Sequence, residues 1–83
     1  MADDLLINVI AIVQDTLRKE SGRNDLVLSP DESMDTVPEW DSMSFMKVFL
    51  SINEAYGIDP DFDEAIHYTS IPTLTEFLRN EIS

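Results

Sequence analysis

An 83-residue chain without cysteine has room for one small domain, and it carries no disulfide, thiolate metal site or thiol nucleophile of its own. Hydrophobic residues make up 43% of the chain and charged residues 27%, which is the composition of a globular domain over residues 1–83. Five basic residues against seventeen acidic ones give a net charge of −12, which argues against nucleic acid and membranes as partners and favours basic protein surfaces.

The first predicted element is a helix from Asp3 to about Lys19. Four apolar residues recur along it at helical spacing: Leu6, Ile10, Val13 and Leu17. The first turn is acidic and the last is basic, the order that the helix dipole favours, and Gly22 predicts the C-terminal stop. The N-terminus is acidic where a secretory signal would be basic, and no apolar run approaches membrane-spanning length, so we expect a cytoplasmic protein.

A long connection is predicted next, because residues 23–40 show no sustained period and contain Pro30 and Pro38. Within it, Ser29 and Glu32 have the spacing of a capping box, which predicts one short turn of helix. A connection of this length in a compact bundle usually signals function or a missed element.

The second long helix is predicted to begin at Asp41 or Ser42 and to run to Tyr56, where Gly57 ends it. One apolar stripe is expected to face the core: Phe45, Val48, Phe49, Ile52 and Tyr56. A second, offset stripe consists of Met43, Met46 and Leu50, bordered by Lys47 and Glu54. This second stripe is interpreted as a surface kept for a partner or a cargo, or else as the completion of the core against the loop.

Two helices are predicted after the turn-rich residues 59–63. A short one runs from Asp63 or Glu64 to Tyr68, and the last one starts between Ser70 and Pro72. The inner face of the last helix is predicted to carry Ile71, Leu74, Phe77, Leu78 and Ile82. No segment alternates as a strand should. The predicted fold is therefore all-α, a small bundle of three main helices plus one short helix, with a long loop between helices 1 and 2.

Ser42 is the first candidate for chemistry, because it lies where the long connection meets the helix with two apolar faces. A serine at the start of a helix has an exposed hydroxyl near the positive end of the helix dipole, where an anionic phosphodiester is stabilised. Taken alone, Asp41 and Ser42 are more simply explained as helix caps, since both are preferred capping residues.

The order and spacing of several motifs add to this observation. They are Trp40-Asp41-Ser42-Met43, then Asn53-Glu54-Ala55-Tyr56-Gly57-Ile58, then an acidic turn, a short helix and Tyr68-Thr69-Ser70-Ile71. Over essentially its whole length the chain resembles the acyl and peptidyl carrier protein family. The resemblance implies a covalent 4′-phosphopantetheine on Ser42, which would make the protein a phosphoprotein carrying an acyl or aminoacyl thioester. Asp41 matches the family's acidic residue beside the attachment site, associated with the magnesium-dependent transferase step.

The resemblance also implies partners. These are a phosphopantetheinyl transferase and acyl- or aminoacyl-loading and transfer enzymes with basic docking surfaces, acting on a monomeric carrier. The implied partner face comprises Met43, Met46, Lys47, Leu50 and Glu54. Fatty acid carriers usually have acidic residues on the exposed face, where this chain has Ser44, Lys47 and Asn53. Since Lys47 would repel a basic groove, we expect a specialised biosynthetic pathway and not general fatty acid synthesis. The bulk of Phe45, Phe49 and Tyr56 suggests a short or polar cargo.

Other classes of function are weaker. We expect no enzymatic activity, because the only histidine, His67, lies far along the chain from Ser42. Residues 59–63 have the spacing that opens a calcium loop, but the sixth position is Glu64 and the twelfth is Ser70, where glycine and glutamate are needed. The run that starts at Asp31 fails in the same way, so we expect no specific metal site.

An unmodified acidic helical adaptor, or a calcium-binding protein, remains the alternative. In an adaptor, Ser42→Ala would remove only a helix cap, about 1 kcal/mol.

Overall fold

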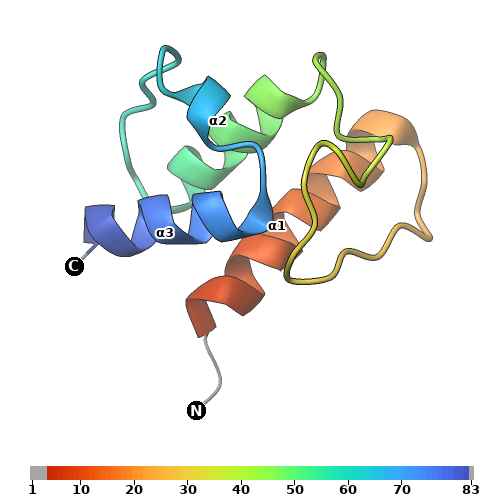
Figure 1. The fold of residues 1–83 in the computed structure, drawn as a ribbon, viewed down its shortest axis with the longest axis horizontal. Coiled ribbons are helices and arrows are strands. Elements are labelled where there is room, and N and C mark those ends of the chain that lie inside the picture. Colours follow the sequence, from red (N-terminus) through yellow and green to blue (C-terminus); the bar gives the residue numbers. More distant parts are fainter. Residues whose placement is uncertain (1–3, 83) are drawn as a thin grey trace.

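The computed structural model describes residues 4–82. They form four helical elements in the order α1 (Asp4–Ser21), α2 (Phe45–Ala55), the short 3₁₀ helix η1 (Ala65–His67) and α3 (Ile71–Ile82), as Figure 1 shows. Residues 4–82 contain no strand, so the prediction of a small all-α bundle with three main helices, one short helix and a long first loop is confirmed.

Helix α1 is the element against which both α2 and α3 pack. It extends two residues beyond the predicted end at Lys19, and the predicted start at Asp3 lies outside the described residues. Gly22 ends it as expected, because this residue adopts a φ of 74° and its N–H donates to the carbonyl of Arg18 at 2.9 Å.

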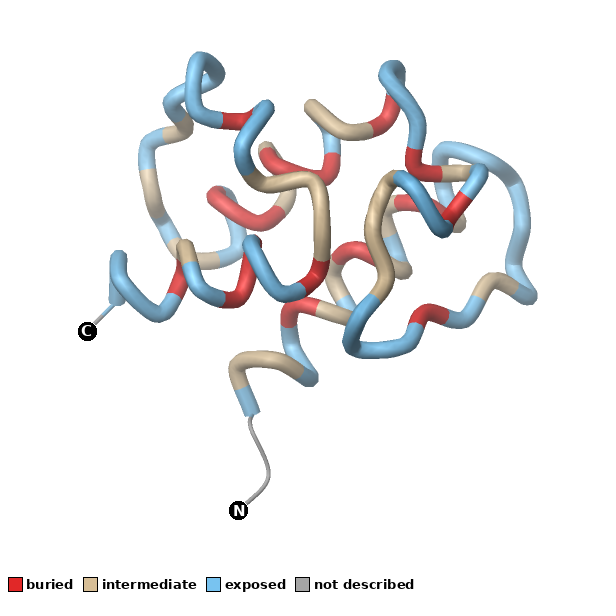
Figure 2. The backbone as a smooth tube through the Cα atoms, in the orientation of Figure 1, coloured by how far each residue is buried: buried red, intermediate tan, exposed pale blue. Residues whose placement is uncertain are grey.

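The core consists of one face from each main helix, which Figure 2 shows as buried segments turned toward the middle of the molecule. The three helices contribute Val9, Val13, Leu17, Val48, Phe49, Ile52, Ile71, Leu74 and Leu78. The stripe predicted to make α2 part of the core does so, with Phe45 and Tyr56 half-buried at its margins. Phe77 is also half-buried, but Ile82 is 52% exposed, so its predicted place on the inner face is wrong. Ile82 lies in the last turn of α3.

The long loop between α1 and α2 is held by its own buried side chains, Leu28, Val37 and Trp40. It is also bonded to the rest of the bundle at two points along its path. The N–H of Leu28 donates to the Gln14 side chain of α1 at 2.9 Å, and a single antiparallel bridge joins Ser33 to Ser70 at the start of α3. The loop is therefore an ordered part of the bundle.

The short helical turn predicted at residues 29–32 is wrong. The Ser29 hydroxyl donates to the Asp31 carboxylate at 2.9 Å, and the Glu32 carboxylate accepts a hydrogen bond from Thr36. Both side chains of the expected capping box are thus used in local turns, which compete with helix formation. The predicted short helix near residues 63–68 is present as η1, reduced to one 3₁₀ turn.

Candidate functional site

The chain around Ser42 forms a turn ahead of α2, so the predicted helix start at Asp41 or Ser42 is wrong by about one turn. The N–H of Phe45 donates to the carbonyl of Asp41 at 3.0 Å, which closes this turn. Regular helix begins at Phe45, because the side chains of Asp41 and Ser44 bond to the backbone of the turn itself.

Asp41 and Ser44 cap this turn reciprocally. The Asp41 carboxylate oxygen Oδ1 accepts the backbone N–H groups of Met43 at 3.0 Å and Ser44 at 3.1 Å. In return the Ser44 hydroxyl accepts the N–H of Asp41 at 2.9 Å and donates to the carbonyl of Glu39, also at 2.9 Å. This is the geometry of a capping box, with Asp41 as the cap.

Ser42 lies between these two capping residues and is exposed. Its hydroxyl makes no hydrogen bond with any other residue in the range 4–82. Asp41 is therefore the residue that caps this turn, and Ser42→Ala removes no capping side chain. The hydroxyl is free to react while the backbone that carries it is held in place.

The Asp41 carboxyl is kept ionised by the turn. The N–H of Met43, followed by that of Ser44, holds its pKa below the ordinary value of 3.8. Both backbone hydrogen bonds go to Oδ1, and Oδ2 accepts no hydrogen bond from residues 4–82. An ionised carboxylate with one uncommitted oxygen, beside an exposed hydroxyl, can hold a cation next to that hydroxyl.

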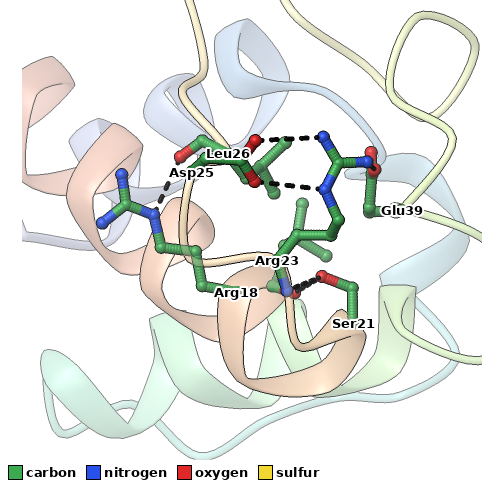
Figure 3. A network of polar contacts seen from close by, with 7 residues as sticks. Arg18, Ser21, Arg23, Asp25, Leu26 and Glu39 are labelled. Carbon is green, nitrogen blue, oxygen red and sulfur yellow. Dashed lines mark hydrogen bonds and ion pairs between the residues drawn. The ribbon is translucent and has the colours of Figure 1, made fainter.

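A network of charged side chains joins the end of α1 to the residues just before the turn, as Figure 3 shows. Arg23 contacts the Glu39 carboxylate at 2.9 Å and the Asp25 carboxylate at 3.1 Å. The hydrogen bond from Arg23 also holds the pKa of Asp25 below its ordinary range. Because the Glu39 carbonyl accepts the Ser44 hydroxyl, this network ends in the turn that carries Ser42.

The residues predicted to form a partner face do not share one environment. Met43 is 83% exposed, and Lys47 and Glu54 are exposed as well. Met46 and Leu50 are half-buried, and Met46 packs against the core. The Lys47 ammonium contacts the Glu20 carboxylate of α1 at 2.9 Å, so part of its charge is neutralised within the molecule.

Two residues assigned to the exposed face of this helix are buried instead. Ser44 is 4% exposed, because its hydroxyl completes the capping box. Asn53 is fully buried, since its side-chain amide donates to the Phe49 carbonyl at 2.8 Å. Of the three positions at which the sequence lacks the acidic residues usual in fatty acid carriers, only Lys47 therefore lies at the surface.

Sequence reasoning missed the contribution of Ser44, Glu39 and Arg23 to this site. The Asp41–Ser44 spacing of a capping box is present in the sequence and could have identified Ser44. Arg23 and Glu39 are sixteen residues apart in the loop, and no local pattern pairs them.

Within residues 4–82, no three histidine, aspartate or glutamate side chains are grouped to hold a metal ion. The same residues include no helix of the length and apolar character that crossing a membrane requires. The exposed His67 packs edge-on against the ring of Tyr68 at 6.5 Å.

Comparison of the chain with protein-family models, curated proteins and solved structures finds no match. The fold and the site define a small acidic helical bundle that presents the exposed Ser42 hydroxyl, unbonded to the rest of residues 4–82, on a capped turn. What this hydroxyl does has to be argued from that geometry.

Proposed function

We propose that this protein is an acyl carrier protein, which carries an acyl or aminoacyl group as a thioester on a 4′-phosphopantetheine arm attached to Ser42. The observation that supports the proposal most strongly is the exposed Ser42 hydroxyl, unbonded to the rest of residues 4–82, on a turn capped by its neighbour Asp41. The resemblance of the motif order to carrier proteins agrees with this position. A chain without cysteine needs such an attached group to carry a thioester.

The attachment requires few changes in the carrier itself. The Ser42 oxygen forms a bond to the phosphorus of the phosphopantetheine of coenzyme A, 3′,5′-ADP leaves, and the hydroxyl proton passes to the transferase. A phosphodiester on Ser42 would lie just ahead of α2, and the N-terminal backbone amides of a helix favour negative charge. Asp41, kept ionised, is the residue that would contact the magnesium ion of the transferase step through Oδ2.

The expected partners are a phosphopantetheinyl transferase and loading and transfer enzymes with basic surfaces, in keeping with the net charge of −12. Met43 is the most exposed large apolar side chain that residues 4–82 present, and it directly follows Ser42. Met43 lines the same hollow as Glu20, Glu39 and Asp41, and an apolar contact beside acidic residues suits an enzyme that must approach the arm. Because Lys47 is exposed, we favour a specialised biosynthetic pathway over general fatty acid synthesis.

Intact-mass measurement after modification tests the proposal. The purified protein is incubated with coenzyme A, magnesium and a broad-specificity phosphopantetheinyl transferase. We expect a single phosphopantetheine addition, abolished by Ser42→Ala and retained by Ser29→Ala, the matched change at an exposed loop serine. Because the Ser42 hydroxyl has no hydrogen-bond partner among residues 4–82, Ser42→Ala should leave the melting temperature unchanged.

An unmodified wild-type protein, shown by circular dichroism to be folded, would contradict the carrier assignment. A calcium-binding protein would instead change structure on adding calcium and gain no covalent mass.

A further inference from the structure

One ion pair joins the start of the long loop to its end. Arg23 directly follows Gly22, which ends α1, and Glu39 lies sixteen residues later, just before Trp40. The Arg23 guanidinium donates from Nη1 to the Glu39 carboxylate at 2.9 Å (Figure 3). The Glu39 side chain is only 15% exposed, so solvent screens this contact less than it screens a pair on the open surface.

Arg23 is itself fixed to the end of α1. Its backbone N–H donates to the Ser21 hydroxyl oxygen at 3.2 Å, and that hydroxyl donates to the Leu17 carbonyl at 2.7 Å. Its side-chain Nε donates to the Asp25 carboxylate at 3.1 Å, which holds the guanidinium at a second point. The side chain of Arg23 therefore spans from the last turn of α1 to the end of the loop.

Glu39 continues this connection through its backbone. Its carbonyl accepts the Ser44 hydroxyl at 2.9 Å, and the same hydroxyl accepts the N–H of Asp41, also at 2.9 Å. Asp41 in turn accepts the N–H groups of the two residues that follow Ser42. The residue that pairs with Arg23 thus also holds one side of the capping box around Ser42.

The other basic residues at the end of α1 make contacts elsewhere. Lys19 pairs with Asp15 at 3.1 Å, one turn earlier on the same helix, and Arg18 donates to the Leu26 carbonyl at 2.8 Å. Neither contact reaches residues 39–44. The pair between Lys19 and Asp15 is therefore a comparison that carries the same charges but has no link to the turn.

We propose that Arg23 is a positioning residue for the modification of Ser42, because its ion pair with Glu39 holds the capped turn and so presents the Ser42 hydroxyl to the transferase in one geometry. This inference rests on the carrier function proposed above. The Ser42 oxygen must approach the phosphorus as 3′,5′-ADP leaves, and misplacing a reacting atom by about 1 Å can slow a reaction roughly 100-fold. Arg23 touches no reacting atom in this role.

Transferase kinetics provide the first test. In Arg23→Gln we expect kcat to fall roughly three-fold, in keeping with a partly exposed ion pair, and KM for the carrier to stay unchanged because the docking surface is intact. Lys19→Gln removes the same charge from the pair with Asp15 and should keep both constants at the wild-type values. A rise in KM alone would mean that Arg23 contacts the transferase directly, and would overturn the inference.

A double-mutant cycle tests whether Arg23 acts through Glu39. Glu39→Gln should lower kcat by the same factor as Arg23→Gln, and the double variant should be no slower than either, because each change removes the same contact. Arg23→Lys, which keeps a positive charge for Glu39, should recover part of the loss. Losses that multiply in the double variant, or a lysine variant as slow as the glutamine variant, would contradict the proposed route.

Amide hydrogen exchange of the unmodified protein measures the turn without any transferase. The N–H groups of Met43 and Ser44 bond to Asp41, so their exchange reports how often the cap opens. In Arg23→Gln we expect roughly three-fold faster exchange at these two amides and no change at Val13 and Ile52 in the core. Unchanged exchange in the turn, or an equal increase at all four amides, would overturn the inference.

The two proposals fail in different ways. Absence of the covalent addition to the wild-type protein would overturn the carrier function and this inference with it. A normal addition, with the same kcat in Arg23→Gln and Lys19→Gln, would overturn the positioning role alone.

Discussion

Asp41 holds two backbone amides with one carboxylate oxygen, and its neighbours on either side lie in opposite environments. Trp40 is 1% exposed and anchors the turn in the core, whereas Ser42 is exposed. A buried aromatic ring, a capping carboxylate and a free hydroxyl thus follow one another in three residues. This arrangement fixes the backbone of the turn and leaves the Ser42 hydroxyl exposed.

Asp41→Asn should change how stability depends on pH. A carboxyl whose pKa is lowered on folding stabilises the protein fully above the pKa of the unfolded chain, and this contribution is lost as pH falls through the folded value. Asn can still accept the two amide hydrogen bonds but carries no charge. We expect a melting-temperature difference between wild type and Asp41→Asn that is level down to about pH 5 and narrows below the ordinary carboxyl pKa of 3.8.

Thermal unfolding followed by circular dichroism between pH 7 and pH 3 measures this difference. Using the difference cancels the general effect of protonating the other carboxylates. A difference that stays constant or widens as the pH is lowered would show that the Asp41 charge does not stabilise the turn.

Helices α1 and α2 end through backbone geometry that glycine permits. At the end of α2, Gly57 has a φ of 66°, its N–H donates to the Glu54 carbonyl at 3.3 Å, and the N–H of Ile58 donates to the Asn53 carbonyl at 2.9 Å. These two bonds form a Schellman motif, which satisfies carbonyls that the helix leaves without partners. The motif turns the chain toward η1 and α3.

Gly57→Ala should destabilise the protein by about 1 kcal/mol, because an alanine is strained at positive φ. A Cβ at this position meets no atom within 4 Å, so the loss comes from the backbone alone. Gly57→Asn should lose less, since asparagine tolerates this conformation better. Urea unfolding measures both variants, and equal losses for alanine and asparagine would contradict a backbone origin.

The capping-box pattern occurs in this sequence both with and without a following helix, so the pattern alone does not predict one. The predicted box at residues 29–32 forms no helix, whereas boxes form at Asp41–Ser44 and at Ser70–Thr73. The two real boxes precede the apolar helices α2 and α3. The residues after Glu32 have no apolar period, so no helix can bury a face there. A cap stabilises a helix that packing already favours.

At the scale of the molecule, repulsion among the acidic side chains is the dominant long-range interaction. Ion pairs are formed by Lys19 with Asp15, by Lys47 with Glu20, and by Arg23 with two carboxylates. These pairs lie at the surface and leave the net charge at −12. The dimensions of 33 × 33 × 20 Å are comparable with the screening length of dilute salt, about 30 Å at 0.01 M, so carboxylates across most of the molecule repel one another there.

Added sodium chloride should therefore raise the melting temperature, most steeply below about 0.15 M, where screening changes most over the size of the molecule. Magnesium chloride should act at lower concentration, because a divalent cation screens more strongly. Differential scanning calorimetry over a salt series measures the effect. A flat response would mean that repulsion among the carboxylates does not limit stability.

Much of the fold could be predicted from the sequence, because helix periodicity and glycine stops act over a few residues. The core stripe of α2 from Val48 to Ile52, and the stops at Gly22 and Gly57, were predicted and are present. Helix ends, such as the start of α2 at Phe45, were less predictable, because they depend on which side chains bond to the terminal backbone groups. The exposure of Ser42 was expected, and its proposed modification stays a prediction.

The sequence by itself determined the all-α architecture, the acidic surface and an exposed serine just ahead of α2, since each depends on composition or on neighbours a few residues apart. Only the tertiary structure decided that Ser44 and Asn53 are buried and that Lys47 pairs with Glu20. These outcomes depend on groups that approach one another only after α1, the long loop and α2 have packed. Burial and pairing are properties of that packed arrangement, and a linear pattern does not contain the distances that create them.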